Sequence, residues 1–270
     1  MKQFNLTLIQ LCSGQYKMTN LSRAEDLIKQ VCQSSKIKKS DLPHMVCLPE
    51  VFNFRSSSGE ENSKAAEEIP GGHAFNWASQ LAIKHKIWIV AGSILELSED
   101  ENKPYNTSFV VNPNGELVTK YRKINLFRLN LENVPELCEP KFRSAGSEIC
   151  TFETAFGKIG LGICFDLRFP EIFREYRKQG CELIILPSAF TYKTGQAHWE
   201  ILCKARAIEN QVFFAAINQA IDSNCWGRSM IVGPWGETIA TLLDQNYGVI
   251  TETIDLDKVY EIREKLPISL

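Results

Sequence analysis

The sequence lacks the cysteine and histidine spacings that metal and redox sites require. Its nine cysteines are scattered along the chain, and the closest pair, Cys138 and Cys150, is 12 positions apart. This spacing excludes a Cys-x-x-Cys redox pair and a zinc knuckle. The four histidines form neither a His-x-x-x-His nor a His-Glu-x-x-His pattern. We therefore expect no bound metal.

The sequence also lacks a long apolar run and an excess of charge of either sign. The longest stretch without a charged residue, 69–83, contains Pro70 and two glycines and is shorter than the roughly 18 apolar residues of a membrane span. The N-terminal segment alternates apolar and polar residues, unlike the apolar core of a signal peptide. With 30 Lys and Arg against 32 Asp and Glu, the chain has no basic field to attract nucleic acid. We expect a cytoplasmic protein without membrane or nucleic-acid partners.

Apolar periodicity predicts alternating strands and helices in two similar halves, each in the order β-α-β-α-β-β. In the first half we expect strands at 4–11, 45–48, 87–94, 107–111 and 116–121, with helices at 21–31 behind an Asn20 cap and at 75–85. In the second half we expect strands at 149–154, 158–164, 183–186, 212–217, 229–233, 237–243 and 248–254, the last three completing the second sheet, and helices at 170–180, 198–211 and 257–265.

Two sheets that are each covered by helices on one face bury their bare faces against each other. The predicted fold class is therefore α/β, a four-layer α-β-β-α sandwich. No linker rich in Gly, Ser or Pro separates the halves, so residues 1–270 are interpreted as one domain.

Three reactive side chains directly follow predicted strands, where functional groups of open α/β sheets gather. Cys164 ends KIGLGIC, Glu50 ends MVCLPE, and Lys123 follows ELVTKYR. A thiol at a strand-to-helix turn is close to backbone N–H groups that favour the thiolate and can bind an oxyanion. Each residue taken alone also fits a structural role. Cys164 would then be a buried thiol, Glu50 a surface carboxylate, and Lys123 a member of a solvated basic run.

Taken in order, the motifs resemble those of the nitrilase superfamily of carbon-nitrogen hydrolases over nearly the whole chain. They are LPEVF, YNTSFVVNPNGELVTKYRKINLF, GKIGLGICFDLRFPE, ILPSAF, TGQAHWEILCKARAIENQ and GRSMIVGPWGE. The resemblance implies the same sandwich fold, a homodimer, and a catalytic triad of Glu50, Lys123 and Cys164. It also implies that a supporting glutamate falls on Glu139, seven residues before Gly146.

The residue types implied by the resemblance fit amide hydrolysis through a thioester without any cofactor. Cys164 would attack the carbonyl, and Glu50 would carry protons to the leaving ammonia and from water. Lys123 and the N–H of Phe165 would stabilise the oxyanion. Glu139 would orient Lys123 and the substrate amide, or would be a loop carboxylate.

The strings CFDLRFPE and AHWE are most similar to the ω-amidase and deaminated-glutathione-amidase branch, whose substrates are small carboxylates with a terminal amide. Arg168 would then bind the substrate carboxylate, or would instead pair with Asp166 or Glu171. Phe190 and His198 are further candidate pocket residues. Arg206 and Glu209, three positions apart, are interpreted as a structural ion pair.

Other functions remain open from the sequence. An N-carbamoyl amino acid hydrolase or a nitrilase would use the same triad. A thiol protease or transferase would pair Cys164 with His198. A non-catalytic binding protein or a thiol redox sensor would keep the fold without the hydrolysis.

Overall fold

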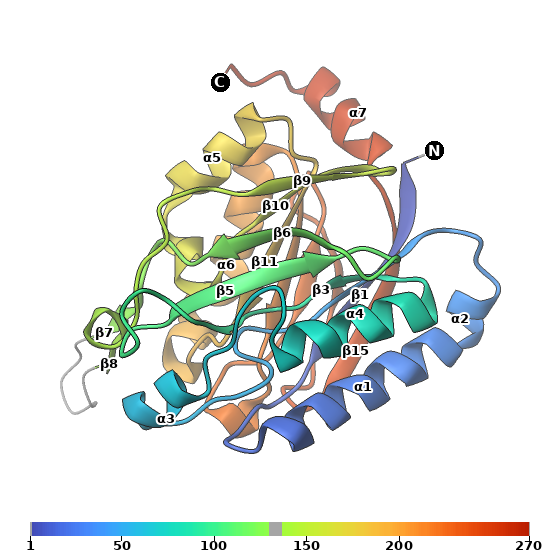
Figure 1. Cartoon of the computed structure of the whole chain (residues 1–270). Helices are drawn as coiled ribbons and strands as arrows, with labels where there is room; N and C mark the ends of the chain where they lie inside the picture. The colour runs from blue at the N-terminus through green and yellow to red at the C-terminus, as the bar shows by residue number, and fades with distance from the viewer. Residues whose placement is uncertain (1, 130–136, 270) are drawn as a thin grey trace.

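The computed structural model, which describes residues 2–129 and 137–269, contains two large β-sheets (Figure 1). The first sheet has the strand order β15-β1-β2-β3-β5-β4, and β6, outside this order, also pairs with β5. Its strands are β1 (Gln3–Gln10), β2 (His44–Cys47), β3 (Trp88–Val90), β4 (Ile94–Glu96), β5 (Tyr105–Val111), β6 (Leu117–Arg122) and β15 (Gly248–Asp255).

The second sheet has the strand order β14-β13-β12-β11-β10-β9. Its strands are β9 (Thr151–Thr154), β10 (Gly157–Leu161), β11 (Leu183–Ser188), β12 (Phe213–Asn218), β13 (Met230–Val232) and β14 (Thr238–Thr241). A separate two-stranded ribbon pairs β7 (Arg128–Leu129) with β8 (Leu137–Cys138).

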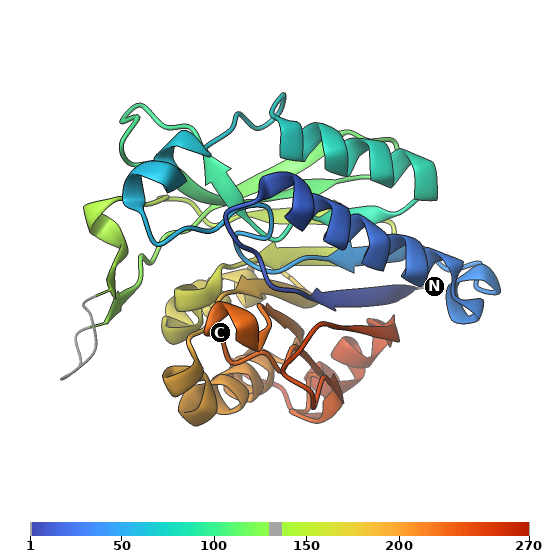
Figure 2. The same cartoon turned by 90° about the horizontal axis from the view of Figure 1, so that it is seen from below.

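Helices cover the outer faces of both sheets. The α-helices are α1 (Lys17–Gln33), α2 (Ser35–Lys38), α3 (Gly59–Lys64), α4 (His73–His85), α5 (Pro170–Lys178), α6 (Tyr192–Asn210) and α7 (Asp257–Lys265). The described residues also form the short 3-10 helices η1 (Glu139–Lys141), η2 (Cys164–Arg168) and η3 (Ile221–Ser223). Figure 2 shows the layers edge-on, with α1 and α4 above the two sheets and α5 and α6 below them. The predicted four-layer α-β-β-α sandwich is confirmed.

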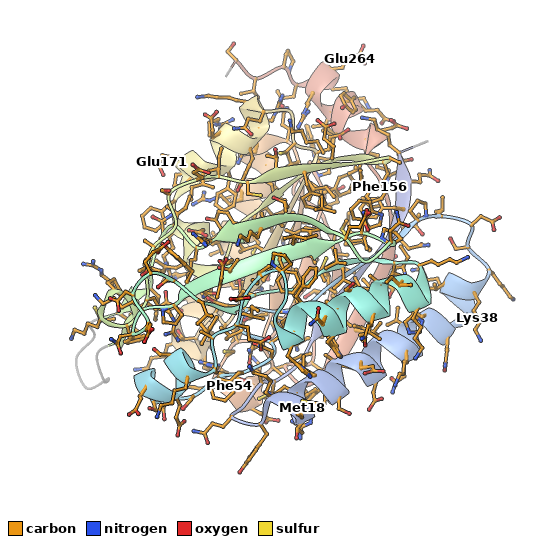
Figure 3. All side chains as sticks on the ribbon, in the orientation of Figure 1. Met18, Lys38, Phe54, Phe156, Glu171 and Glu264 are labelled. Carbon is orange, nitrogen blue, oxygen red and sulfur yellow. The ribbon has the colours of Figure 1, made fainter. Side chains whose placement is uncertain are left out.

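The apolar side chains of a single strand contribute to two different layers of the core. In β1, Leu6 and Leu8 face the second sheet, whereas Ile9 joins the cluster that packs on α1 and α4. Successive strand residues point to opposite faces, so one strand serves both layers. Between the sheets, Phe156 stacks on Phe4 with ring centroids 4.2 Å apart (Figure 3). The two sheets therefore share one continuous core.

The predicted place of the last strand is wrong. Instead of completing the second sheet, β15 pairs antiparallel with β1 over eight residues, from Gln3 opposite Asp255 to Gln10 opposite Gly248. An uncovered β1 would expose a long row of unpaired backbone groups at the sheet edge, and β15 removes that edge. This long-range pairing links the two ends of the chain.

Several element boundaries also differ from the prediction. Helix α1 begins at Lys17, so Asn20 lies inside the helix, where its side chain bonds the backbone of Gly14 and Asn53 instead of capping. The stretch 87–94 divides into β3 and β4 at Gly92, whose φ is +36° and where a Cβ would lie 1.9 Å from the Pro49 oxygen. Helix α6 begins six residues before His198.

A buried histidine begins β2. His44, 5% exposed, is bonded through Nε2 to the Thr7 hydroxyl at 2.8 Å, and Thr7 contacts Thr251 on β15. Burial lowers the pKa of His44 from 6.5 to about 4. As the pH falls, His44 is protonated in the unfolded chain at a higher pH than in the folded protein. The unfolding free energy present above pH 6.5 is therefore lost as the pH falls toward 4.

We predict that His44→Gln reduces this acid sensitivity. In wild type the histidine should cost about 2–3 kcal/mol of unfolding free energy between pH 7 and pH 4. Urea unfolding at both pH values measures the difference, with His73→Gln at an exposed histidine as the matched control. Equal pH dependence in wild type and both variants would contradict the prediction.

Candidate active site

A cavity of about 190 Å³ opens where several strands of the two sheets end. Its charged lining residues in the described chain are Glu50, Arg55, Lys123, Glu139 and Arg143. Its aromatic walls are Phe54, Phe127, Phe142, Phe165 and Phe190, of which Phe54 is labelled near α3 in Figure 3. The volume is below the range of about 300–1,000 Å³ typical of drug-sized ligands, so the cavity suits a small molecule.

Glu50 is held at the end of β2 by three donors. Its Oε1 accepts from Asn106 Nδ2 at 2.8 Å and from Lys123 Nζ at 2.9 Å. Its Oε2 accepts from the backbone N–H of Ala189 at 2.7 Å. Ala189 follows β11 of the second sheet, whereas Glu50 follows β2 of the first. The Glu50 carboxylate, which is 4% exposed, therefore connects the two sheets at the cavity.

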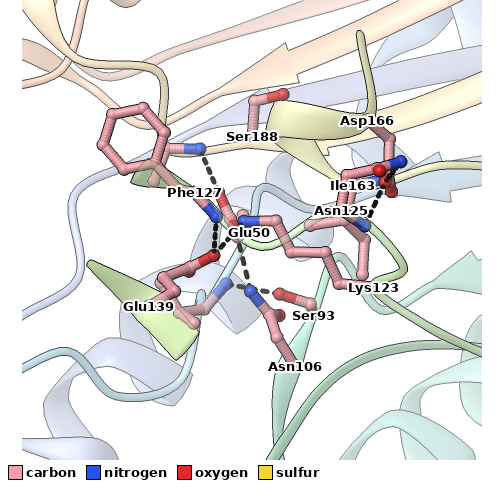
Figure 4. A network of polar contacts seen from close by, with 12 residues as sticks. Glu50, Ser93, Asn106, Lys123, Asn125, Phe127, Glu139, Ile163, Asp166 and Ser188 are labelled. Atoms are coloured by element: carbon pink, nitrogen blue, oxygen red, sulfur yellow. Dashed lines mark hydrogen bonds and ion pairs between the residues drawn. The ribbon is translucent and has the colours of Figure 1, made fainter. Parts of the chain in front are cut away.

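Lys123 lies between two carboxylates, as Figure 4 shows. Its Nζ is 2.9 Å from Glu50 Oε1 and 2.9 Å from Glu139 Oε2, and the side chain is 1% exposed. Glu139 Oε2 also accepts from the backbone N–H of Phe127 at 2.7 Å. Burial by itself would lower the pKa of Lys123, but Glu139 and Glu50 outweigh it and raise the pKa well above the ordinary value. Lys123 is an ammonium ion at neutral pH.

Cys164 follows β10 and begins η2 with a φ of +46°, a left-handed conformation that few side chains adopt. Burial raises the pKa of the Cys164 thiol well above its ordinary value, and the Glu50 charge raises it further. Burial also opposes ionisation of Glu50, but Lys123 outweighs it and lowers the carboxyl pKa. The resting site therefore pairs a neutral thiol with an ionised carboxylate.

Asp166 holds the turn that carries Cys164. Its Oδ2 accepts from the Ile163 N–H at 2.9 Å and from the Tyr121 hydroxyl at 2.7 Å. Its Oδ1 accepts from the backbone N–H and the side-chain amide of Asn125 at 2.9 and 3.0 Å. The two Asn125 bonds connect the thiol's turn to the segment after β6 that carries Lys123 (Figure 4), and the Tyr121 bond connects it to β6.

The structure brings four of the predicted site residues together: Glu50, Lys123, Glu139 and Cys164. Phe165 and Phe190 line the same cavity.

Arg168 and His198 are not among the residues that line it. Arg168 Nη2 is 3.3 Å from His198 Nδ1 on the exposed side, and its guanidinium lies over the Phe190 ring. In the described chain, Arg168 forms an ion pair with neither Asp166 nor Glu171.

Sequence reasoning missed several residues of the site, among them Asn106, Asp166, Arg55 and Arg143. Asn106 on β5 bonds Glu50, and Asp166 organises the Cys164 turn. The asparagine that precedes the apolar end of YNTSFVV and the aspartate two residues after Cys164 in CFDLR could have indicated both. Arg55 and Arg143 line the cavity but lie in loops where a basic residue is ordinary. The structural ion pair between Arg206 and Glu209 is present at 3.0 Å.

The described residues contain no cluster of His, Cys, Asp and Glu suited to a metal ion. They also contain no helix long and apolar enough to cross a membrane.

The chain is similar to known proteins over nearly its whole length. The carbon-nitrogen hydrolase family model matches residues 5–264. The chain is 41% identical to the omega-amidase NIT2 of Xenopus tropicalis over 273 residues, 99% of this chain and 94% of that one. It is 39% identical to the Homo sapiens omega-amidase NIT2 over 274 residues, with the same coverage of both chains.

A solved structure is similar over nearly the same length. Saccharomyces cerevisiae Nit3, a member of branch 10 of the nitrilase superfamily, superposes with a TM-score of 0.87 at 32% identity. The superposition covers 99% of this chain and 96% of Nit3. The chain belongs to the carbon-nitrogen hydrolase family.

We predict that Asp166→Asn destabilises the turn, because an amide nitrogen replaces one acceptor oxygen and leaves a buried N–H or O–H without a partner. The expected loss is about 1–3 kcal/mol of unfolding free energy. Urea unfolding measures it, with Asp41→Asn at an exposed aspartate as control. A loss below about 0.5 kcal/mol, within the range of an ordinary surface substitution, would show that the four bonds do not stabilise the fold.

Proposed function

We propose that the protein is an ω-amidase-type amidohydrolase that releases ammonia from the terminal amide of a small substrate carrying a carboxylate. The observation that carries the proposal is the Glu50–Lys123–Glu139 chain of ion pairs beside the Cys164 thiol in one small cavity. The omega-amidase names of the similar proteins support the substrate class.

The first step joins the substrate to the enzyme. As Cys164 Sγ bonds to the amide carbon, Glu50 takes the thiol proton, which the raised thiol pKa keeps in place until the substrate arrives. The carbonyl oxygen becomes an oxyanion. The Lys123 ammonium and the N–H of Phe165 stabilise it in a site that largely excludes water.

The second step releases ammonia. Glu50 passes its proton to the amide nitrogen, the C–N bond breaks, and a thioester on Cys164 remains. A water molecule then gives a proton to Glu50 and attacks the thioester carbon. Collapse of this second intermediate frees the carboxylic acid product, and the proton returns to the Cys164 sulfur.

Glu139 is proposed to position Lys123. Its carboxylate is oriented by the Phe127 N–H and holds the ammonium from the side opposite Glu50. With two carboxylates sharing it, Lys123 stays charged while Glu50 gains and loses a proton. No cofactor takes part in these steps.

The other carbon-nitrogen substrates are second candidates. A carbamoyl group or a nitrile presents an electrophilic carbon to the same thiol, so an N-carbamoyl amino acid hydrolase or a nitrilase would use the same residues. Ammonia release from a panel of terminal amides, carbamoyl amino acids and nitriles distinguishes them. The proposal requires the carboxylate-bearing amides to be turned over with the highest kcat/KM.

We also propose a homodimer in the cytoplasm. Ile201 and Ile208, seven residues apart on α6, are 69% and 50% exposed, and an apolar face of this kind suits a partner copy. All nine cysteines are free, which fits a reducing compartment.

We predict that Glu50→Gln lowers kcat/KM by about 10²–10⁴, because a neutral amide accepts no proton from the thiol or from water. Steady-state ammonia release measures the change, and Glu101→Gln at an exposed glutamate is the control. A circular dichroism spectrum like that of wild type checks the fold. Retention of activity within about tenfold would show that Glu50 is not the base.

We predict that His198→Ala retains kcat/KM within about threefold. In the described structure this exposed histidine bonds Arg168 and does not line the cavity, so it is not placed to serve Cys164 as a base. Lys123→Met should lower kcat/KM by at least about 10² in the same assay. The reverse ranking of the two variants would favour the protease-like pairing of Cys164 with His198.

A further inference from the structure

An amide side chain of β5 holds the carboxylate of Glu50. Asn106 lines the cavity and is 2% exposed. Its Nδ2 donates to Glu50 Oε1 at 2.8 Å, and the same oxygen accepts from Lys123 Nζ at 2.9 Å (Figure 4). The main-chain carbonyl of Asn106 accepts from the Lys123 N–H at 2.8 Å. One residue of β5 therefore holds both members of the buried ion pair.

The oxygen of the same amide has no partner. Asn106 Oδ1 is buried and accepts no hydrogen bond in the described part of the chain. A buried acceptor without a donor lowers the unfolding free energy, and a leucine of similar size would avoid this cost. Stability alone therefore does not account for an amide at this position.

The hydrogen bonds to Glu50 leave one acceptor position open. Each carboxylate oxygen has two lone pairs. Asn106 and Lys123 occupy both lone pairs of Oε1, whereas the N–H of Ala189 occupies one lone pair of Oε2 at 2.7 Å. The Cys164 thiol also hydrogen-bonds the Glu50 side chain. The second lone pair of Oε2 is the position left for it.

We propose that Asn106 is a positioning residue for the base: with Lys123 it fills Glu50 Oε1, so that Oε2 is the atom that takes the thiol proton. This inference rests on the proposed function and assigns its proton transfers to one atom. As the S–C bond to the substrate forms, the S–H bond breaks and the proton moves to Oε2. The Oε2–H bond then breaks when the amide nitrogen takes this proton and the C–N bond opens. Oε1 keeps both donors throughout, so the carboxyl group does not rotate between the two transfers.

A second buried glutamate has the same kinds of donors and provides a matched control. Glu67 Oε1 accepts from Lys17 Nζ at 2.5 Å and from Asn53 Nδ2 at 3.3 Å. Glu67 Oε2 accepts from the Ala74 N–H at 2.7 Å. Asn53 is buried, and its Oδ1 likewise has no partner among the described residues. Neither Glu67 nor Asn53 lines the cavity in the described structure, so this pair repeats the hydrogen bonds away from the thiol.

The test is the pH dependence of the hydrolysis of glutaramate, a five-carbon monoamide with a carboxylate. Asn106→Leu removes a donor that favours the ionised form of Glu50, so the Glu50 pKa should rise. The acidic limb of kcat/KM should therefore move to higher pH by about one unit. The kcat above this limb should fall at least about tenfold, because the base is no longer held in place.

A second variant checks the direction of the effect. Asn106→Asp has nearly the same size as the wild-type side chain but adds a carboxylate beside Glu50. Two carboxylates in one site oppose each other's ionisation, so the acidic limb should move further than in Asn106→Leu. Thermal unfolding and circular dichroism check the fold, and either variant that keeps the wild-type fold is sufficient for the test.

The other charged or titratable groups that act on Glu50 are unchanged in these variants. They are Lys123 and its second partner Glu139, the thiols of Cys164 and Cys225, and the guanidinium groups of Arg55 and Arg143. The carboxylate of glutaramate titrates equally in assays of wild type and variants. A difference between the pH profiles therefore reports on the Asn106 contact.

Asn53→Leu removes the matching donor from Glu67 and is expected to leave the acidic limb where it lies in wild type. An unmoved limb in a folded Asn106 variant would overturn the inference. An equal shift in Asn53→Leu would overturn it as well, because the shift would then follow from the loss of any buried amide.

Alkylation of Cys164 by iodoacetamide separates this inference from the proposed function. As the new S–C bond forms and iodide leaves, Glu50 takes the thiol proton, and no hydrolysis is involved. Peptide mass spectrometry follows the rate at Cys164 across acidic and neutral pH, and the midpoint should rise in Asn106→Leu as the hydrolysis limb does. Absence of ammonia release from any amide by wild type would refute the proposed function, while the alkylation profiles would still decide on Asn106. An unchanged alkylation midpoint would overturn the inference.

Discussion

The site depends on one buried ammonium ion, Lys123, held between the carboxylates of Glu50 and Glu139 at 2.9 Å each. Removing one partner of such a buried group leaves an uncompensated charge and costs about 3–5 kcal/mol. Burial opposes ionisation of Glu50, but the Lys123 charge outweighs it and lowers the carboxyl pKa. Burial, and then the Glu50 charge, raise the pKa of the Cys164 thiol. An ionised Glu50 carboxylate and a neutral Cys164 thiol can therefore coexist in the cavity.

The sandwich fold allows this arrangement because its two sheets place different strand ends at one cavity. Glu50 follows β2 of the first sheet, and Cys164 follows β10 of the second. The Ala189 N–H, after β11, donates to Glu50 across the boundary between the sheets. The Asp166 network then ties the Cys164 turn to the segment of Lys123. Misalignment of the sheets would therefore disturb the base and the thiol together.

Local pattern was sufficient to predict most strands, the bounds of α7, and the positions of Glu50 and Cys164 after buried strands. It was not sufficient for contacts that depend on distant segments. The pairing of β15 with β1 joins residues that are about as far apart as the chain allows, and no periodicity encodes it. Arg143 is similar: its sequence context resembles a solvated loop, and only the folded chain buries it beside Glu139.

The proposed hydrolysis passes through a thioester on Cys164. Hydroxylamine added to the wild-type enzyme during turnover of glutaramate tests for this intermediate, because this strong nucleophile competes with water for an acyl-enzyme. If the thioester forms, we expect a hydroxamate in proportion to hydroxylamine, at the expense of the free acid and in step with ammonia release. Undiminished acid and ammonia without any hydroxamate would indicate direct attack by water and would refute the thioester.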